Sequence, residues 1–129
     1  MKKLEVTKGI EKNDQVLLLV QEGVVNEEAN QYTAGGRMLV DSDNLAFIYI
    51  LEKSDEYVYL HISESIWPTI QSAYTSRTPI YVSLIEEAQI ELVQFHEEMD
   101  YLLDSIDDNC NYGQDMVDAV NKVFGKVSP

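Results

Sequence analysis

The 129-residue chain has little of what stabilises small secreted proteins or marks membrane proteins. Its single cysteine, Cys110, cannot form an internal disulfide, so nothing in the sequence indicates an oxidising compartment. The longest aliphatic run, residues 16–20, has the length of a strand and is much too short to cross a bilayer. The basic residues after Met1 are not followed by the apolar core of a signal peptide. We therefore expect a cytoplasmic protein that does not bind membranes.

Internal repeats, low-complexity tracts and linkers rich in proline, glycine and serine are also absent. With 45% hydrophobic residues, a chain of this length can bury about two-thirds of the surface that its unfolded form exposes. The sequence therefore predicts a single domain over residues 1–129.

Lysine and arginine are absent between Arg77 and Lys122, although this segment is rich in acids. Residues 1–77 have twelve acids and seven bases, whereas residues 78–121, here called the acidic block, have eleven acids and no base. The acids of the block are Glu86, Glu87, Glu91, Glu97, Glu98, Asp100, Asp104, Asp107, Asp108, Asp115 and Asp118. A surface with this excess of acids has a negative electrostatic field, which repels nucleic acid and anionic membranes and attracts basic surfaces or cations. The charge pattern thus argues against nucleic acid as a partner and favours a basic protein.

The first half of the chain predicts an antiparallel β-meander. Apolar residues alternate or form short runs that turn residues separate, in residues 4–6, 15–22, 38–40, 45–52 and 56–62. The polar residues 26–36, which end in two glycines, predict a loop. Residues 79–84 predict a further short strand. Residues 88–92 could pair back with it as a hairpin or begin the next helix, and we favour the short strand.

The predicted strand at residues 45–51 is apolar on both faces, which is typical of a central strand that is covered on both sides. We expect one face to pack against the helices. Tyrosines mark the other face, namely Tyr49, Tyr57 and Tyr59. Tyrosine combines apolar area with a polar tip, so this face is suited to a ligand or a second subunit. The interpretation that the sequence favours, however, is that the long loop and the N-terminal strand cover this face.

Helical spacing of apolar residues appears over residues 63–76, 92–106 and 111–127. In the second of these helices, the apolar residues step by three and four, as Leu92, Phe95, Met99, Leu102 and Ile106. The opposite side carries Glu97, Asp100, Tyr101, Asp104 and Asp108. The predicted fold class is therefore α+β, with an N-terminal antiparallel meander and about three helices, two of them C-terminal, packed on the sheet.

No combination of residues in the sequence supports catalysis. Residues 41–52 have acids at three positions of a calcium loop, but they lack its glycine and a further ligand. His61 and His96 fall on different predicted elements, which gives little support to a transition-metal site. Cys110 has no local signature of a nucleophile. The sequence therefore indicates no catalytic residue, no metal and no cofactor.

Parts of the chain are similar to a known family. The motifs are Asp41-Ser42-Asp43-Asn44 followed by Phe47, Tyr49 and Leu51, then Glu98-Met99-Asp100-Tyr101-Leu102 and Asn111-Tyr112-Gly113. Together they resemble the YjbL-like family of small acidic proteins from low-GC Gram-positive bacteria. The resemblance covers residues 38–124. The N-terminal strands are similar to those of the family only in their general character. It implies a bacterial cytosolic setting and transfers no activity, cofactor or site residue.

Three functional hypotheses follow from these patterns. The first is a protein-binding or regulatory module that binds a basic partner through Glu97, Asp100, Tyr101, Asp104 and Asp108. The second is a homodimer that associates through the tyrosine face, with the acids serving solubility alone. The third, which the sequence favours least, is a small-molecule or metal-binding enzyme with its site near Asp41, Asp43, His61 or His96.

Overall fold

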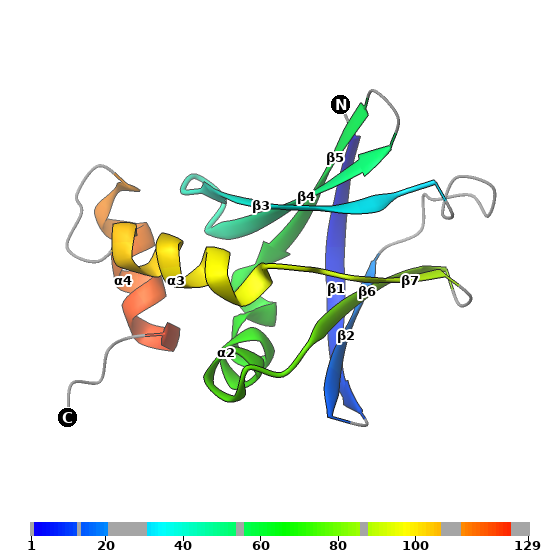
Figure 1. Cartoon of the computed structure of the whole chain (residues 1–129). Helices are drawn as coiled ribbons and strands as arrows, with labels where there is room; N and C mark the ends of the chain where they lie inside the picture. The colour runs from blue at the N-terminus through cyan, green and yellow to red at the C-terminus, as the bar shows by residue number, and fades with distance from the viewer. Residues whose placement is uncertain are drawn as a thin grey trace.

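The computed structural model describes residues 2–12, 14–20, 31–53, 56–85, 88–106 and 112–124. In chain order these residues form β1 (Lys2–Lys12), β2 (Gln15–Val20), β3 (Thr33–Asp41), β4 (Ala46–Lys53), β5 (Glu56–Ser63), the 3₁₀ turn η1 (Glu64–Ile66), α2 (Trp67–Ser76), β6 (Ile80–Ile85), β7 (Ala88–Glu91), α3 (Phe95–Ile106) and α4 (Gln114–Phe124). The three α-helices lie together at one side of a curled sheet, and α3 runs beside β3 (Figure 1). The predicted α+β class, with two of the helices C-terminal, is confirmed.

The strands of the described residues form one mixed sheet in the order β3-β4-β5-β1-β2-β6-β7. Neighbours joined by short turns are antiparallel, as predicted, but β1 is parallel to β5 and β2 is parallel to β6. The prediction of an antiparallel meander is therefore wrong for the middle of the sheet. The reason is that the β1–β2 hairpin lies between β5 and β6, and α2, which connects those two strands, packs across the hairpin.

A cluster of aromatic rings joins the helices to the sheet. Three rings contact one another there, with centroids 4.9 to 5.9 Å apart: Trp67 at the start of α2, Phe47 of β4 and Phe124 of α4. The Trp67 indole N–H donates to the Ile62 carbonyl at 2.9 Å, so this buried polar group is satisfied. β4 is buried on both faces between Ala46 and Leu51, as its apolar pattern predicts.

The described part of the predicted loop at residues 26–36 is partly strand, because β3 already begins at Thr33. The pairing of β3 with β4 is irregular between Ala34 and Met38, where Gly36 has φ +71°. A Cβ atom at Gly35 would lie 2.6 Å from the Ile50 carbonyl oxygen, which is too close for any side chain. Only glycine therefore allows β3 to approach β4 this closely. The glycine pair thus marks a bulge inside a strand, and residues 26–30 lie outside the described residues.

None of the helices in the described ranges has both the length and the apolar composition that a membrane span requires.

Candidate functional site

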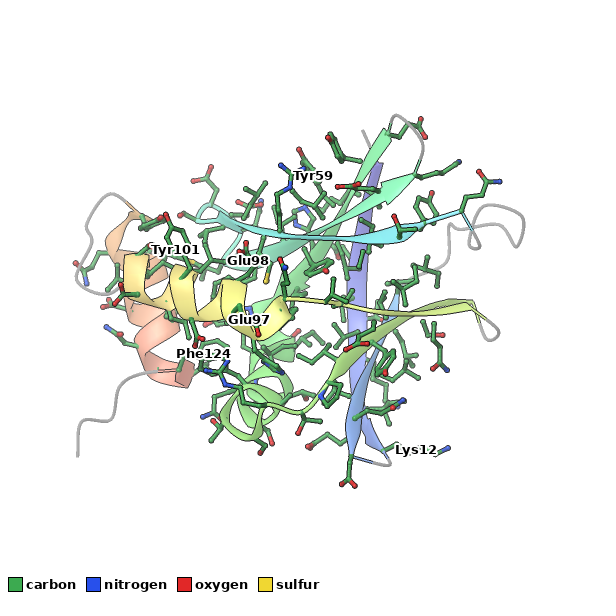
Figure 2. The ribbon with its side chains drawn as sticks, viewed as in Figure 1. Lys12, Tyr59, Glu97, Glu98, Tyr101 and Phe124 are labelled. Carbon is green, nitrogen blue, oxygen red and sulfur yellow. The ribbon has the colours of Figure 1, made fainter. Side chains whose placement is uncertain are left out.

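The strongest candidate site is the outer side of α3. Phe95, Met99, Leu102 and Ile106 are buried against the core, as their spacing predicts. The same helical period places Glu97, Asp100, Tyr101 and Asp104 together on the opposite side, and all four are exposed. We call these four residues the acidic face of α3; Figure 2 labels Glu97 and Tyr101 on this helix. Asp108, which the sequence assigned to the same surface, lies outside the described residues.

Glu98, the other acid of this turn, has a structural role. Its Oε1 atom accepts a hydrogen bond from the Met38 backbone N–H at 2.9 Å. This contact joins α3 to β3, the strand at the edge of the sheet. An outward-facing N–H of that edge is therefore paired with a carboxylate. Because its carboxylate is engaged in this bond, Glu98 is less accessible to a binding partner than the exposed Glu97 is.

Asp100 is the most constrained member of the acidic face. Its carboxylate accepts a hydrogen bond from the Tyr74 hydroxyl and two from Arg77 Nη2, at 2.9 and 3.1 Å. The Tyr74 hydroxyl, followed by the Arg77 guanidinium, lowers the pKa of Asp100. Burial, reinforced by Asp100, raises the pKa of Tyr74 to about 12. The bonded set of Tyr74, Arg77 and Asp100 therefore connects the end of α2 to α3.

Arg77 reaches this position because α2 ends there. Its backbone is left-handed, with φ +56°, and its N–H bonds back to carbonyls of the last turn. The guanidinium carbon lies 4.8 Å from the centre of the Tyr74 ring, so the cation stacks on the ring while it pairs with Asp100. The sequence shows Arg77 as the boundary of the acidic block, and spacing along the chain does not show that it folds back onto the block.

Asp104 and Glu97 are less constrained by neighbouring side chains than Asp100 is. Asp104 makes no hydrogen bond or ion pair with any residue that the structure describes. The pKa of Arg77 is raised mainly by its hydrogen bond to Asp100, and the charge of Glu97 adds only a small contribution. Between Glu97 and Asp104, Tyr101 is the most exposed of the large hydrophobic side chains in the described ranges, at 69%. The acidic face therefore presents an aromatic ring between carboxylates.

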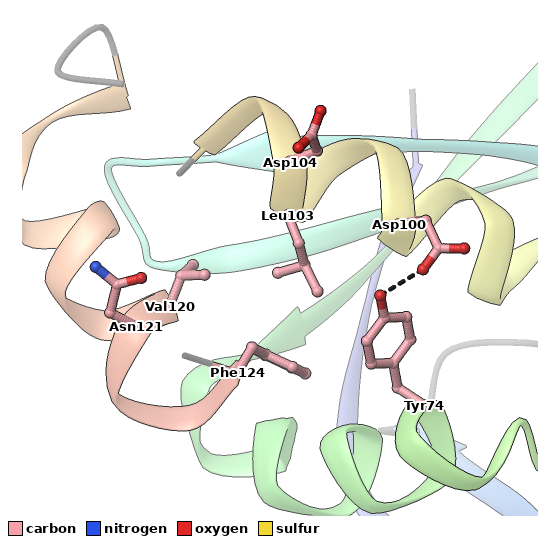
Figure 3. A pocket seen from close by; sticks show the side chains of 7 residues that line it. All are labelled: Tyr74, Asp100, Leu103, Asp104, Val120, Asn121 and Phe124. Atoms are coloured by element: carbon pink, nitrogen blue, oxygen red, sulfur yellow. Dashed lines mark hydrogen bonds between the residues drawn. The ribbon is translucent and has the colours of Figure 1, made fainter. Parts of the chain in front are cut away.

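A cavity of about 220 Å³ lies beside the acidic face, where α2, α3 and α4 meet. It is lined by Tyr74, Asp100, Leu103, Asp104, Val120, Asn121 and Phe124. Figure 3 shows Leu103 and Phe124 pointing into it, and Tyr74 reaching up to Asp100. Sequence reasoning missed this cavity, although Leu103 gave a signal, since it is an apolar residue outside the three-and-four pattern of the buried side.

The predicted tyrosine face is not a single surface. The register places Tyr49 opposite Leu60, whereas Tyr59 is opposite Ile50 and Tyr57 is opposite Glu52. Because paired residues of antiparallel strands share a face, Tyr49 lies on the opposite face from the other two. The pattern of one strand does not fix its register with the next, and this is why the sequence grouped the three residues.

Tyr49 is fully buried, with 0% of its surface exposed. Its hydroxyl donates to the Val93 carbonyl at 2.7 Å and accepts from the Gly36 N–H at 3.2 Å. Burial raises its pKa to about 12. Tyr57 is 47% exposed and carries the Arg37 guanidinium 5.7 Å from its ring centre, so only the Tyr57 and Tyr59 part of the predicted face remains accessible.

The residues suggested for an enzyme or metal site are only partly brought together. His61 Nδ1 lies 4.0 Å from Asp41 Oδ2, and burial lowers the pKa of this histidine, which favours its neutral form. Asp41 is hydrogen-bonded to Asn44, which lowers the pKa of its carboxyl. His96 Nε2 instead bonds the Thr78 carbonyl at 2.6 Å. No group of three metal-ligating side chains occurs among the residues that the structure describes, a range that leaves out Cys110.

Comparison with known proteins extends the resemblance seen in the sequence. The sequence model of UPF0738, described as a family of unknown function, matches residues 4–124 and so includes β1 and β2. The YjbL protein of Bacillus subtilis is 40% identical to this chain over 95% of it and 97% of the relative. A Bacillus licheniformis relative is 36% identical over the same shares, and one from Bacillus velezensis is 48% identical over 70% of this chain and 74% of its own. No solved structure matches the chain.

Proposed function

Because the chain belongs to the UPF0738 family, whose description assigns no activity, we propose from its own geometry that it is a protein-binding module that docks a basic partner on the acidic face of α3. The observation that carries the proposal is the 69% exposure of Tyr101 among Glu97, Asp100 and Asp104. A tyrosine contributes large apolar area with little conformational entropy to lose, and it is enriched among the residues that dominate binding energy.

The carboxylates around Tyr101 set which partner fits. Glu97 and Asp104 lie four residues before and three residues after it, so they flank the ring on the same side of α3. Exposed charges of this kind steer association and select the sign of the partner more than they add affinity. Binding should therefore be fast at low salt and weaken as salt is added, since screening acts over roughly 8–10 Å at 0.1–0.15 M.

Affinity capture tests this proposal with matched variants. The chain is used as bait in a Bacillus subtilis lysate, with Glu97→Gln/Asp104→Asn as the test variant and Glu11→Gln/Glu56→Gln as the charge-matched control. Tyr101→Ala is compared in the same way with Tyr57→Ala. We expect one set of basic proteins, identified by mass spectrometry, to be retained by the unaltered chain and both controls, lost with both test variants, and reduced in high salt.

Equal capture by the test and control variants would contradict the proposal, provided that circular dichroism shows all variants folded. All six side chains that are compared in this experiment are exposed. Substitutions at such positions usually change the free energy of unfolding by less than about 0.5 kcal/mol.

The homodimer is a second candidate, and one observation favours it. Leu39 and Tyr57, 43% and 47% exposed, lie on the same outer face of the sheet as Ile48 and Ile50. Cations and acids both border this face, among them Lys3, Arg37 and Glu52. A border of mixed sign suits a two-fold contact, in which one patch must complement itself.

A further inference from the structure

The cavity beside the acidic face has the size of one side chain. Its volume is about 220 Å³, below the roughly 300–1,000 Å³ of pockets that hold drug-sized ligands. Leu103, Val120 and Phe124 give it an apolar interior, and all three also pack against the core. An apolar cavity of this size suits an aliphatic or aromatic side chain better than a polar metabolite.

The mouth of the cavity is polar and acidic. Asp100, Asp104 and Asn121 are exposed there. In Figure 3 the Asp104 carboxylate points away from the apolar side chains, toward the outer side of α3. Arg77 balances the charge of Asp100 through its ion pair, and Asp104 has no such partner among the described residues. A cation at the mouth therefore meets an uncompensated carboxylate.

The difference between the apolar interior and the acidic mouth determines the orientation of any group that binds in the cavity. A charged group placed against Leu103, Val120 and Phe124 would lose its hydration without gaining a partner, which is strongly unfavourable. The apolar part of an occupant must then enter the cavity while its positive charge stays at the mouth. A phosphate or carboxylate at the mouth would be repelled by Asp104.

We propose that the cavity between α2, α3 and α4 receives an apolar or aromatic anchor side chain from a segment of the partner whose neighbouring lysine or arginine pairs with Asp104. This proposal rests on the proposed function and specifies the partner: a basic segment that carries a bulky apolar residue beside its cations. The anchor supplies the buried centre of the interface and the carboxylates form its rim, the arrangement that concentrates binding energy in a few residues.

The geometry can be tested without knowing the partner by using 2-phenylethylamine as a probe, since it joins one aromatic ring to one ammonium group. Titration of the ¹⁵N-labelled chain is followed by amide chemical shifts. Phenylacetate serves as the anionic control and butylamine as the control without a ring. We expect shifts centred on Tyr74, Leu103 and Phe124. The apparent Kd of the probe should be about fivefold lower than that of phenylacetate, as one exposed ion pair provides. It should also be lower than that of butylamine, which has the ammonium group but no ring to fill the cavity.

Two variants locate the binding. Asn121→Trp, at an exposed position of α4, places a ring over the mouth and should weaken probe binding about fivefold or more, because the ring occupies the volume that the probe needs. Asp104→Asn should remove the preference for the amine over phenylacetate. The titration of the unaltered chain does not depend on either variant folding. Shifts that map elsewhere, or equal affinity for the cation and the anion, would overturn the proposal.

The two proposals fail in different ways. Asn121→Trp leaves Glu97 and Tyr101 unchanged, so capture at the level of the unaltered chain, with no probe binding, would refute the anchor cavity and leave the acidic face in place. Probe binding at the cavity combined with capture that ignores Glu97, Tyr101 and Asp104 would refute the proposed function instead.

Discussion

At the scale of single residues, Tyr49 shows how one side chain can have two environments. Its ring stacks on Phe95 with centroids 6.1 Å apart, inside the core, while its hydroxyl bridges the backbones of Gly36 and Val93. The apolar pattern of β4 predicted that position 49 faces a covered side, but the bridge depends on residues 13 and 44 positions away. No local pattern in the sequence contains that information.

Removing the Tyr49 hydroxyl should destabilise the chain more than its size suggests. In Tyr49→Phe, the Gly36 N–H and the Val93 carbonyl lose their partner inside the protein, and a buried unsatisfied polar group costs about 1–3 kcal/mol. Urea denaturation followed by circular dichroism measures the loss. Tyr57→Phe is the matched control and should stay within about 0.5 kcal/mol, because Tyr57 is 47% exposed. Equal stabilities of the two variants would contradict the assigned bridge.

Asp100 should make stability depend on pH in the acidic range. Its pKa is lower in the folded chain than the ordinary value because Tyr74 and Arg77 stabilise its charged form. A carboxyl with a depressed folded pKa contributes stability above its unfolded pKa of about 3.9, and this is lost as pH falls through the folded value. The melting temperature of the unaltered chain should thus exceed that of Asp100→Asn at neutral pH, and the gap should narrow upon acidification. Thermal melts of both proteins, with Asp104→Asn as the control, measure the gap; a constant gap would be inconsistent with the assigned contacts.

The exposure of the acidic face could be predicted from residues alone, whereas its electrostatics could not. Helical spacing correctly placed Glu97, Tyr101 and Asp104 opposite the buried side. The pairing of Asp100 with Arg77 requires the turn at the end of α2 to lie against α3, which is a tertiary contact. Charge counted along a sequence therefore overestimates the negative surface wherever a distant base folds back.

At the scale of elements, α3 and β3 are held together by a charged hydrogen bond as well as by apolar packing. Helix α3 itself was predictable because its apolar residues repeat over three turns. The start of β3 was not predictable, since its glycines resemble those of a loop, although they serve a bulge that brings Gly35 close to Ile50. Glycine indicates an unusual backbone without indicating which kind.

Loss of the Glu98 side chain should loosen this contact between elements. Glu98→Ala removes the acceptor of the Met38 N–H, and hydrogen bonds to charged groups contribute about 1.5–3 kcal/mol. We expect faster hydrogen exchange at the Met38 amide and a lower free energy of unfolding. Glu98→Gln keeps an acceptor and should lose less, and Glu97→Ala, at an exposed position of the same helix, should change neither. Unchanged exchange in Glu98→Ala would show that this bond does not protect the strand.

At the scale of the whole molecule, the sheet order could not be obtained from local patterns. Each hairpin follows from the turn that joins its strands, and β6 and β7 pair as the sequence predicted. The parallel contacts of β1 with β5 and of β2 with β6 join segments that are more than fifty residues apart. Which strands become neighbours in these two pairs depends on the packing of the complete fold. The fold class survives this error because it depends on which elements exist and not on their order.

The outer face of the sheet supports a prediction about assembly. If Leu39, Tyr57 and Tyr59 form a two-fold contact, size-exclusion chromatography with light scattering should give a dimer at high protein concentration. Tyr57→Asp/Tyr59→Asp should convert it to a monomer, because two carboxylates would be buried at the interface without partners. Tyr101→Asp, which alters the acidic face, should leave the dimer intact. A monomer for the unaltered chain at all concentrations would exclude this contact.

The carboxylate of Glu98 on the Met38 N–H also bears on how the chain behaves when it is crowded. The margin of a sheet is a template on which another polypeptide can add a strand, and proteins restrain such growth with charges or with covering elements. Here one acid does both, because it occupies the hydrogen-bonding position and brings α3 alongside. An incoming strand would have to displace a charged group and a helix before it could register with β3. Protection from fibrous self-association is thus built into the same helix that presents its other side to solvent.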